Sequence, residues 1–208
     1  MCGVIGYVPP SEGPMPDTGE LFHMFWRLLS ESRIRGMHAY GIARPGFVFR
    51  SLDFDEVWKH FDPRFPTIAH CRYSTSGDWR KLENNQPIVV GQLALAFNGV
   101  IHMGTKEELE RDFGVDLETD NDGEAFLRRI IEDGDTSAET FHHYIMRMDG
   151  SFAGVWLQGD KLYAGRNERR PLWASKWGGT TWYASTENIF HRAGFDRYAC
   201  TEVPVGVW

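Results

Sequence analysis

The last third of the chain contains four segments rich in aromatic and β-branched residues, and turn residues separate them. The segments are SFAGVWL from Ser151, KLYAGR from Lys161, PLWASKW from Pro171 and TTWYAST from Thr180. Gly159-Asp160 and Gly178-Gly179 fall between neighbouring segments. Strands joined by such short glycine-containing turns run antiparallel. The sequence therefore predicts an antiparallel meander here, and a doubly wound parallel sheet is disfavoured.

The remaining periodicities place strands on both sides of helical stretches, without strict β-α-β alternation. We expect strands at residues 3–8, 41–43, 47–50, 67–73 and 93–101, and helices at residues 20–32, 54–61, 106–113, 122–132 and 138–148. Residues 74–87 are polar and are expected to form a long loop of the kind that often carries function. This order favours an α+β fold of layered antiparallel sheets and helices, forming a single domain over residues 1–208.

Composition and charge exclude several classes of protein. With 42% hydrophobic and 25% charged residues, the 208-residue chain has the profile of a folded domain. Its net charge of −7 and its lack of a basic run disfavour nucleic-acid binding. The strongest apolar stretches, such as Leu93 to Phe97, are far shorter than the roughly 20 residues of a membrane span. We expect no membrane insertion.

Cysteine usage and the absence of ligand motifs narrow the chemistry. The chain has an odd number of cysteines, Cys2, Cys71 and Cys200, without C-x-x-C spacing, which favours a reducing compartment. No secretory signal is readable, so we expect a cytoplasmic location. The eight histidines form no H-E-x-x-H motif, and neither common nucleotide-binding glycine motif is present. The sequence therefore predicts no metal and no cofactor.

Cys2 can combine a nucleophile and a base in one residue. Removal of Met1 would leave a thiol and a free α-amine on Cys2, at the head of a strand. An α-amine with a pKa of about 7.7 to 8.0 is partly neutral at physiological pH, so it can accept the proton of a thiol whose pKa is about 8.5. N-terminal nucleophile enzymes use this arrangement in place of a separate catalytic base. If Met1 is retained, Cys2 lacks its amine and the enzyme is immature.

Several short strings in a fixed order resemble the glutaminase domain of class II glutamine amidotransferases. In chain order they are MCGVIGYV, RGMHAYGIA from Arg35, AHCRYSTSG from Ala69, NNQPI from Asn84, FNGVI from Phe97, NDGE from Asn121, MDGSFAGVWLQGDKLYAGRNERRPL from Met148 and WYASTEN from Trp182. The resemblance runs nearly end to end, and RYSTSG is closest to the amidophosphoribosyltransferase-type branch. It implies an N-terminal nucleophile hydrolase fold, a four-layer αββα sandwich of two mostly antiparallel sheets.

The resemblance also assigns roles to residues of this chain. Cys2 would be the nucleophile, and the side-chain amide of Asn98 with the backbone N–H of Gly99 would form the oxyanion hole. Such donors are each worth on the order of 3 kcal/mol in the transition state. Arg72 would bind the α-carboxylate of glutamine and Asp122 its α-ammonium group.

Other matched positions would complete the glutamine pocket. The resemblance places Tyr73, Thr75 and Ser76 along its wall, with Thr75 as the direct contact, and Arg35 near its opening. The residue types alone leave other readings open: Asn98-Gly99 could be a turn or bulge, and Asp122 an ordinary first residue of a helix.

The chain departs from the family pattern at several of these places. Where the family has x-Asp-Ser after Arg-Gly, this sequence has Met37, His38 and Ala39. Phe97 replaces a frequent His, Met103 a frequent Asn, and Ser76 stands where some members have His. Hydrogen bonding around the catalytic amine and the oxyanion loop is therefore expected to differ.

Together these features predict an enzyme that hydrolyses the side-chain amide of L-glutamine through a Cys2 thioester, releasing glutamate and ammonia. Because the expected single domain includes no acceptor or synthetase domain, a separate synthetase would be the partner that takes the ammonia. One alternative is an N-terminal cysteine amidohydrolase of another γ-glutamyl amide. A second is a non-catalytic binding or regulatory module that keeps the fold, which the departures at His38, Phe97 and Met103 favour.

Overall fold

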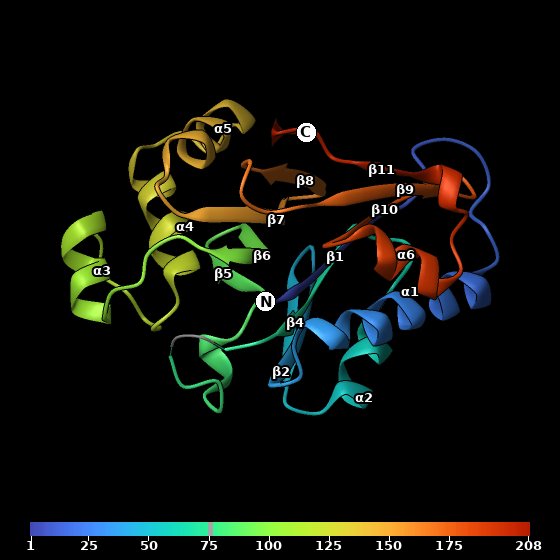
Figure 1. The fold of residues 1–208 in the computed structure, drawn as a ribbon, viewed down its shortest axis with the longest axis horizontal. Helices are drawn as coiled ribbons and strands as arrows, with labels where there is room; N and C mark the ends of the chain where they lie inside the picture. Colours follow the sequence, from blue (N-terminus) through green and yellow to red (C-terminus); the bar gives the residue numbers. More distant parts are fainter. Residues whose placement is uncertain (75–76) are drawn as a thin grey trace.

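The computed structural model describes residues 1–74 and 77–208, and its strands form two antiparallel sheets (Figure 1). The larger sheet has the order β11-β9-β10-β1-β4-β2-β3, with β1 Gly3–Val8, β2 Ala39–Arg44, β3 Phe47–Ser51, β4 Thr67–Arg72, β9 Trp173–Trp177, β10 Thr180–Ala184 and β11 Cys200–Glu202. The smaller sheet has the order β12-β8-β7-β6-β5, with β5 Ile88–Val90, β6 Leu93–Val100, β7 Ser151–Gln158, β8 Lys161–Arg166 and β12 Gly206–Val207.

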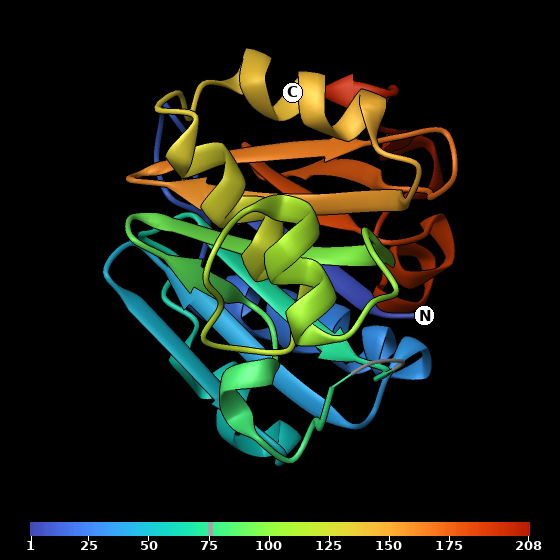
Figure 2. The same cartoon turned by 90° about the vertical axis from the view of Figure 1, so that its left-hand side faces the viewer.

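Helices cover the outer face of each sheet. Those over the larger sheet are α1 Thr18–Ser32, α2 Phe54–Val57 and α6 Glu187–Ala193, and those beside the smaller sheet are α3 Lys106–Phe113, α4 Asp122–Glu132 and α5 Ala138–Arg147. Short 3₁₀ helices occur at Arg33–Arg35, Trp58–His60, Leu82–Asn84 and Arg197–Ala199. Figure 1 shows α3, α4 and α5 on one side of the strands and α1, α2 and α6 on the other, and in Figure 2 the viewer looks onto α3 and α4 with the strands behind them. The fold is the αββα sandwich that the motif resemblance implied.

Three apolar clusters hold these layers together. One packs α1, α2 and α6 on the larger sheet, and another packs α4 and α5 on the smaller sheet. The cluster between the two sheets is built largely from small and β-branched residues, among them Val4, Ile68, Ala94, Ala96 and Ala153. Small side chains on facing strands let the two sheets approach closely.

Alternation along the strands decides which residues face the other sheet. Because successive side chains point to opposite faces, residues two apart share a face. Val4, Ile68 and Ala96 lie in the cluster between the sheets. Cys2 precedes Val4 by two positions and Asn98 follows Ala96 by two, so both belong to rows that face the space between the sheets.

The predicted elements are largely confirmed, with end shifts of one or two residues, except that the helix expected at residues 54–61 is α-helical only over Phe54–Val57 and continues as the 3₁₀ helix Trp58–His60. Local capping explains where they begin: the side chain of Asp17 accepts from Glu20 N at 3.0 Å, and Thr105 with Glu108 forms a capping box at α3. Within the ranges described, no helix is both long enough and apolar enough to cross a membrane.

The expected four-stranded meander is wrong as a single sheet. β7 and β8 pair in the smaller sheet, whereas β9 and β10 pair in the larger one. The chain crosses between sheets at 167–172, where Leu172 is fully buried in the cluster between them. The hairpin turns can be recognised in the sequence, but the sequence of a turn does not indicate which sheet the hairpin joins. Four elements were not expected from the sequence: α6 and the very short strands β5, β11 and β12.

Candidate functional site

Cys2 lies at the junction of the two sheets, where it is held from several sides. Its backbone N donates to Oδ1 of Asn98 at 3.0 Å, and its Sγ donates to the carbonyl O of Tyr73 at 3.6 Å. Nε of Arg35 donates to the carbonyl O of Cys2 at 2.8 Å. Burial raises the pKa of the Cys2 thiol, and the hydrogen bond to Tyr73 and the charges of Arg72 and Arg35 oppose this shift. The thiol is therefore protonated at neutral pH.

The backbone of Phe97, the residue before Asn98, is bonded by two side chains in place of a neighbouring strand. β5 pairs with β6 only as far as Leu95, so the outer edge of Phe97 has no strand beside it. Oε1 of Gln86 accepts from Phe97 N at 2.6 Å, and Nε2 of His70 lies 3.2 Å from Phe97 O. Because Phe97 O can only accept, Nε2 carries the proton. These two bonds replace the missing strand and set the position of β6 at Asn98.

Asn98 and Gly99 carry two hydrogen-bond donors near the end of β6, the Nδ2 group of Asn98 and the backbone N–H of Gly99. Nδ2 of Asn98 is buried and has no hydrogen-bond partner among the described residues, although Oδ1 of the same amide is bonded to Cys2. A buried donor without a partner is costly, and a ligand that accepts a hydrogen bond would relieve that cost. Backbone groups alternate along a strand, so Gly99 N–H faces the same edge as Phe97 N–H, beyond the end of β5.

Position 99 requires glycine for a separate reason. A Cβ there would lie 1.9 Å from the carbonyl O of Ser151. Asn98 and Gly99 lie inside β6, opposite Ala153 and Phe152, so the strand is continuous through them and the turn or bulge alternative is wrong.

Arg72 is buried, with 5% of its surface exposed, and so is not a surface ion-pair residue. Its guanidinium donates to the carbonyl O of Asn84, to Oδ1 of Asn85 at 2.9 Å and to Oγ of Ser74 at 3.3 Å. Burial lowers the pKa of Arg72, and Cys2 and Asp122 oppose this shift through their charges.

Asp122 is the first residue of α4. Its Oδ2 accepts from the backbone N of Ile101 at 2.7 Å and of His102 at 3.2 Å. Burial raises the pKa of the Asp122 carboxyl, and these backbone bonds oppose the rise. The side chain therefore joins the start of α4 to the segment after Gly99, which exceeds the role of an ordinary first-turn residue.

The segment after Arg72 is anchored by His38. Ser74 N donates to Nδ1 of His38 at 2.9 Å, and the His38 ring stacks on both Tyr73 and Trp79 at centroid distances of 5.1 and 5.2 Å. His38, which departs from the family pattern, thus bonds the loop that follows β4. Tyr73 is half exposed and meets Cys2 through its backbone. The predicted contacts Thr75 and Ser76 lie outside the described residues.

Four residues of this region had no expected role: Asn84, Asn85, Gln86 and His70. They nevertheless lie in the matched strings NNQPI and AHCRYSTSG. Asn84 links the two halves of the site: its carbonyl accepts from Arg72, and its side chain bonds N and Oδ2 of Asp120 at 3.0 and 3.1 Å. The signal was present as three consecutive amide side chains, a pattern typical of backbone-bonding loops.

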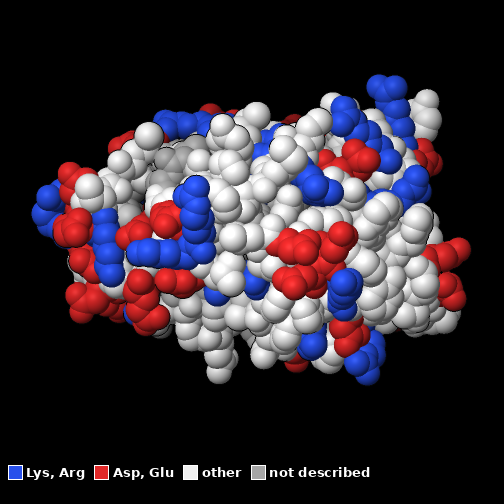
Figure 3. All heavy atoms as spheres, turned by 90° about the horizontal axis from the view of Figure 1, so that it is seen from below, with Lys and Arg blue, Asp and Glu red and all other residues white. Residues whose placement is uncertain are grey.

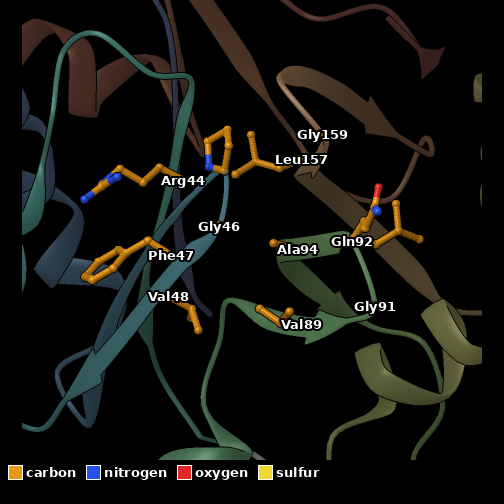
Figure 4. A pocket seen from close by; sticks show the side chains of 12 residues that line it. Arg44, Gly46, Phe47, Val48, Val89, Gly91, Gln92, Ala94, Leu157 and Gly159 are labelled. Atoms are coloured by element: carbon orange, nitrogen blue, oxygen red, sulfur yellow. The ribbon is translucent and has the colours of Figure 1, made fainter.

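A cavity lies at the other end of the sandwich. It has a volume of about 490 Å³ and is bounded by the β2–β3 turn, the β5–β6 turn and the turn after Leu157 (Figure 4). The strand registers place these turns opposite the end that carries Arg72 and Gly99. Figure 4 shows Val48, Val89 and Ala94 around the space, with Arg44 directed away from them. Its apolar wall includes no nucleophile.

Charges of both signs are interspersed on the face in Figure 3, and no continuous basic stripe crosses it. Together with the net charge of −7, this face offers no footprint for a phosphate backbone.

No family model matches the sequence, and no curated protein matches it. Solved structures do match. Glutamine phosphoribosylpyrophosphate amidotransferase from B. subtilis, in complex with ADP and GMP, has a TM-score of 0.69 and 21% identity over 97% of this chain and 44% of that chain. An allosteric regulatory enzyme of purine biosynthesis has a TM-score of 0.68 and 21% identity, with the same coverages of 97% and 44%.

A glutamine aminotransferase class-II domain protein from Silicibacter pomeroyi is more distant but similar in length. Its TM-score is 0.54, its identity 13%, and the match covers 99% of this chain and 93% of that one. This chain thus spans less than half of the first two structures and nearly all of the third. The resemblance drawn from the motifs is confirmed at the level of the fold, and the chain has the N-terminal nucleophile hydrolase fold of these amidotransferase structures.

Proposed function

We propose that this chain is an N-terminal cysteine amidohydrolase that hydrolyses the side-chain amide of L-glutamine to glutamate and ammonia. The observation that carries the proposal is the pairing of Cys2 with Asn98: Oδ1 binds the nitrogen of Cys2 at 3.0 Å, while Nδ2 is buried and unpaired within the described structure. One amide thus orients the base and leaves a donor for the oxyanion.

The reaction begins once Met1 is removed and the amine of Cys2 is free. The neutral amine accepts the thiol proton as Sγ attacks the amide carbon, and Asn98 Nδ2 with Gly99 N–H stabilises the oxygen that becomes negative. The amine then returns the proton to the leaving nitrogen, and ammonia departs. Water, deprotonated by the same amine, hydrolyses the thioester and restores the thiol.

Arg72 and Asp122 are the groups proposed to recognise the amino acid end of glutamine, as guanidinium and carboxylate for the α-carboxylate and α-ammonium. Tyr73, Thr75 and Ser76 are proposed to line the same pocket, and Arg35 to hold Cys2 through its carbonyl. Because burial raises the pKa of the Cys2 thiol, attack depends on proton transfer to the amine. We expect kcat/KM to rise with pH and to level off above about pH 8, where the amine is neutral.

Glutamate release from L-glutamine tests the proposal directly. The protein is prepared without Met1, which intact mass verifies, and is compared with Cys2→Ala and with Cys200→Ala, a second free cysteine outside the site. We expect release to vanish in the first variant and to persist in the second. Asn98→Ala should lower kcat by about 10²- to 10³-fold. No release from the verified protein would favour the alternative of a non-catalytic binding module.

We further propose that the ammonia passes to a separate cytoplasmic acceptor enzyme that docks at the Cys2 end. Four apolar side chains near this end are well exposed: Ile34 and Met37 at 68%, Tyr73 at 50% and Met103 at 86%. Exposed apolar side chains rimmed by polar groups are typical of protein interfaces. A complex isolated with this chain should use glutamine or free ammonia, and Met37→Glu should abolish only the glutamine-dependent reaction.

A further inference from the structure

A cavity of about 400 Å³ opens beside the residue that precedes the nucleophile. Met1 forms part of its wall together with Glu31, Arg35, Tyr73 and Arg192. Nη2 of Arg35 lies 3.6 Å from Sδ of Met1, so the side chain of Met1 is held against this wall. Removal of Met1 therefore enlarges the cavity and exposes Arg35 to it.

The geometry of the amine identifies what this cavity faces. In the proposed reaction the amine of Cys2 gives its proton to the leaving nitrogen, so the two nitrogens must lie within hydrogen-bond reach. One direction at that amine is taken by Oδ1 of Asn98, and another is the bond to Met1, which removal of Met1 frees. The cavity that Met1 lines lies on the side of the Cys2 nitrogen that removal of Met1 frees, and neither Arg72 nor Asp122 is part of its wall.

Size and charge indicate what kind of leaving group fits. Ammonia is comparable to water, whose share of liquid volume is about 30 Å³, so a cavity of about 400 Å³ is far larger than ammonia needs. Two guanidinium groups, Arg35 and Arg192, face one carboxylate, Glu31, and the Glu31–Arg192 pair is loose at 4.0 Å. The wall thus carries an excess of positive charge, which suits a group bearing a carboxylate.

We propose that this cavity is a leaving-group pocket and that the substrates include γ-glutamyl amides of amines that carry a carboxylate, such as γ-glutamyl amino acids. The inference rests on the proposed Cys2 chemistry. Sγ bonds to the γ-carbon as the C–N bond breaks, and the leaving nitrogen takes a proton from the Cys2 amine. Water then cleaves the thioester, so that γ-glutamyl amide and water yield glutamate and the free amine.

Three substrates with the same γ-glutamyl group test the pocket: L-glutamine, γ-L-glutamylglycine and γ-L-glutamylethylamide, whose leaving group carries no carboxylate. Glutamate release is measured with Met1-free protein, and kcat/KM for each amide is divided by that for glutamine. We expect γ-glutamylglycine to exceed the ethylamide by about tenfold or more. Arg192→Met should lower the ratio for γ-glutamylglycine about tenfold and leave that for the ethylamide unchanged.

Glu31→Gln should raise the ratio of kcat/KM for γ-glutamylglycine to that for glutamine, because it removes the negative charge from the cavity wall. Arg197→Met, an exposed arginine outside the cavity, is the matched control and should change neither ratio. Glutamine hydrolysis without preference for γ-glutamylglycine, or ratios that ignore Arg192 and Glu31, would overturn the pocket and leave the proposed function standing. Absence of Cys2-dependent hydrolysis of all three amides would overturn both.

Discussion

At the scale of single residues, the candidate site depends on buried polar groups whose partners come from distant parts of the chain. His70 is the clearest case: it is fully buried between Arg72 and Phe97, and its Nε2 lies 3.2 Å from the carbonyl O of Phe97. It touches no substrate in the proposed reaction. Its role is to position β6, because its bond replaces one that a neighbouring strand would otherwise make.

His70 gives the protein a pH-dependent stability. Burial, assisted by the charge of Arg72, lowers the pKa of His70 from 6.5 to about 3. Below about pH 6.5 the unfolded chain therefore binds a proton at His70, whereas the folded chain does not. The contribution of His70 to the free energy of unfolding is thus present above pH 6.5 and is lost as the pH falls towards 3. Between pH 7 and pH 5 we expect a loss of about 2 kcal/mol in the free energy of unfolding.

Urea unfolding of the parent chain and of His70→Gln at pH 7 and pH 5 measures the contribution of His70 to the free energy of unfolding. Gln keeps an amide donor for Phe97 O but does not titrate. The parent should lose about 2 kcal/mol more than the variant between pH 7 and pH 5. Equal losses in both proteins would show that His70 is not the group responsible.

At the scale of elements, α4 and β6 approach each other closely at Gly123 and Phe97. Gly123, the second residue of α4, lies against the ring of Phe97, and a Cβ there would be 2.7 Å from Cε1 of that ring. Phe97 itself stacks on Phe152 at 5.5 Å, so the ring has little room to move. The close approach brings Asp122 at the start of α4 next to the segment that follows Gly99.

Gly123→Ala tests this fit. Alanine favours a helix, but the clash with Phe97 should dominate and lower the free energy of unfolding by about 1–3 kcal/mol. Because α4 carries Asp122, KM for the γ-glutamyl substrate should also rise. Phe97→Leu shortens the opposing side chain, so the double variant should be less impaired than the sum of the single ones. Additive effects measured by urea unfolding and steady-state kinetics would contradict direct contact.

At the scale of the whole molecule, the candidate site is a property of the spacing between the two sheets. Cys2 and Arg72 belong to strands or strand ends of the larger sheet, whereas Asn98 belongs to the smaller sheet. The cluster between the sheets is rich in alanine, which keeps the sheets close. The distance between nucleophile and oxyanion donor is therefore set by packing several residues away.

Ala96→Leu should separate stability from catalysis. Ala96 is fully buried between the sheets, two positions before Asn98, so a larger side chain forces the sheets apart and costs about 1–3 kcal/mol. A shift of about 1 Å between Cys2 and Asn98 should lower kcat by about 10²-fold. The matched control is Leu95→Ala, which removes packing on the helix-facing side of the same strand.

Both variants are compared by thermal unfolding and by kcat at a temperature where each is folded. We expect similar losses of stability but a much larger loss of kcat for Ala96→Leu. Equal losses of kcat would mean that the sheet spacing does not control the site.

Local side-chain patterns were enough to predict most elements and the order of the candidate site residues along the chain. Strand and helix periodicity is local, so residues 3–8, 106–113 and 122–132 were predicted correctly from their own side chains. Cys2 and the Asn98-Gly99 pair also stood out locally, one by its place next to Met1 and the other by interrupting an apolar strand.

Only the tertiary structure decided which sheet each hairpin joins and which polar groups meet. β7–β8 and β9–β10 read alike in sequence, yet they lie in different sheets because Leu172 is buried between the sheets at the crossing. The bonds of His70 and Gln86 to Phe97, and of Arg72 to Asn84, span 11 to 27 positions along the chain. Such pairs leave no periodic signal in the sequence. Each side chain bonds a backbone group that would be left buried and unpaired once the sheets have packed.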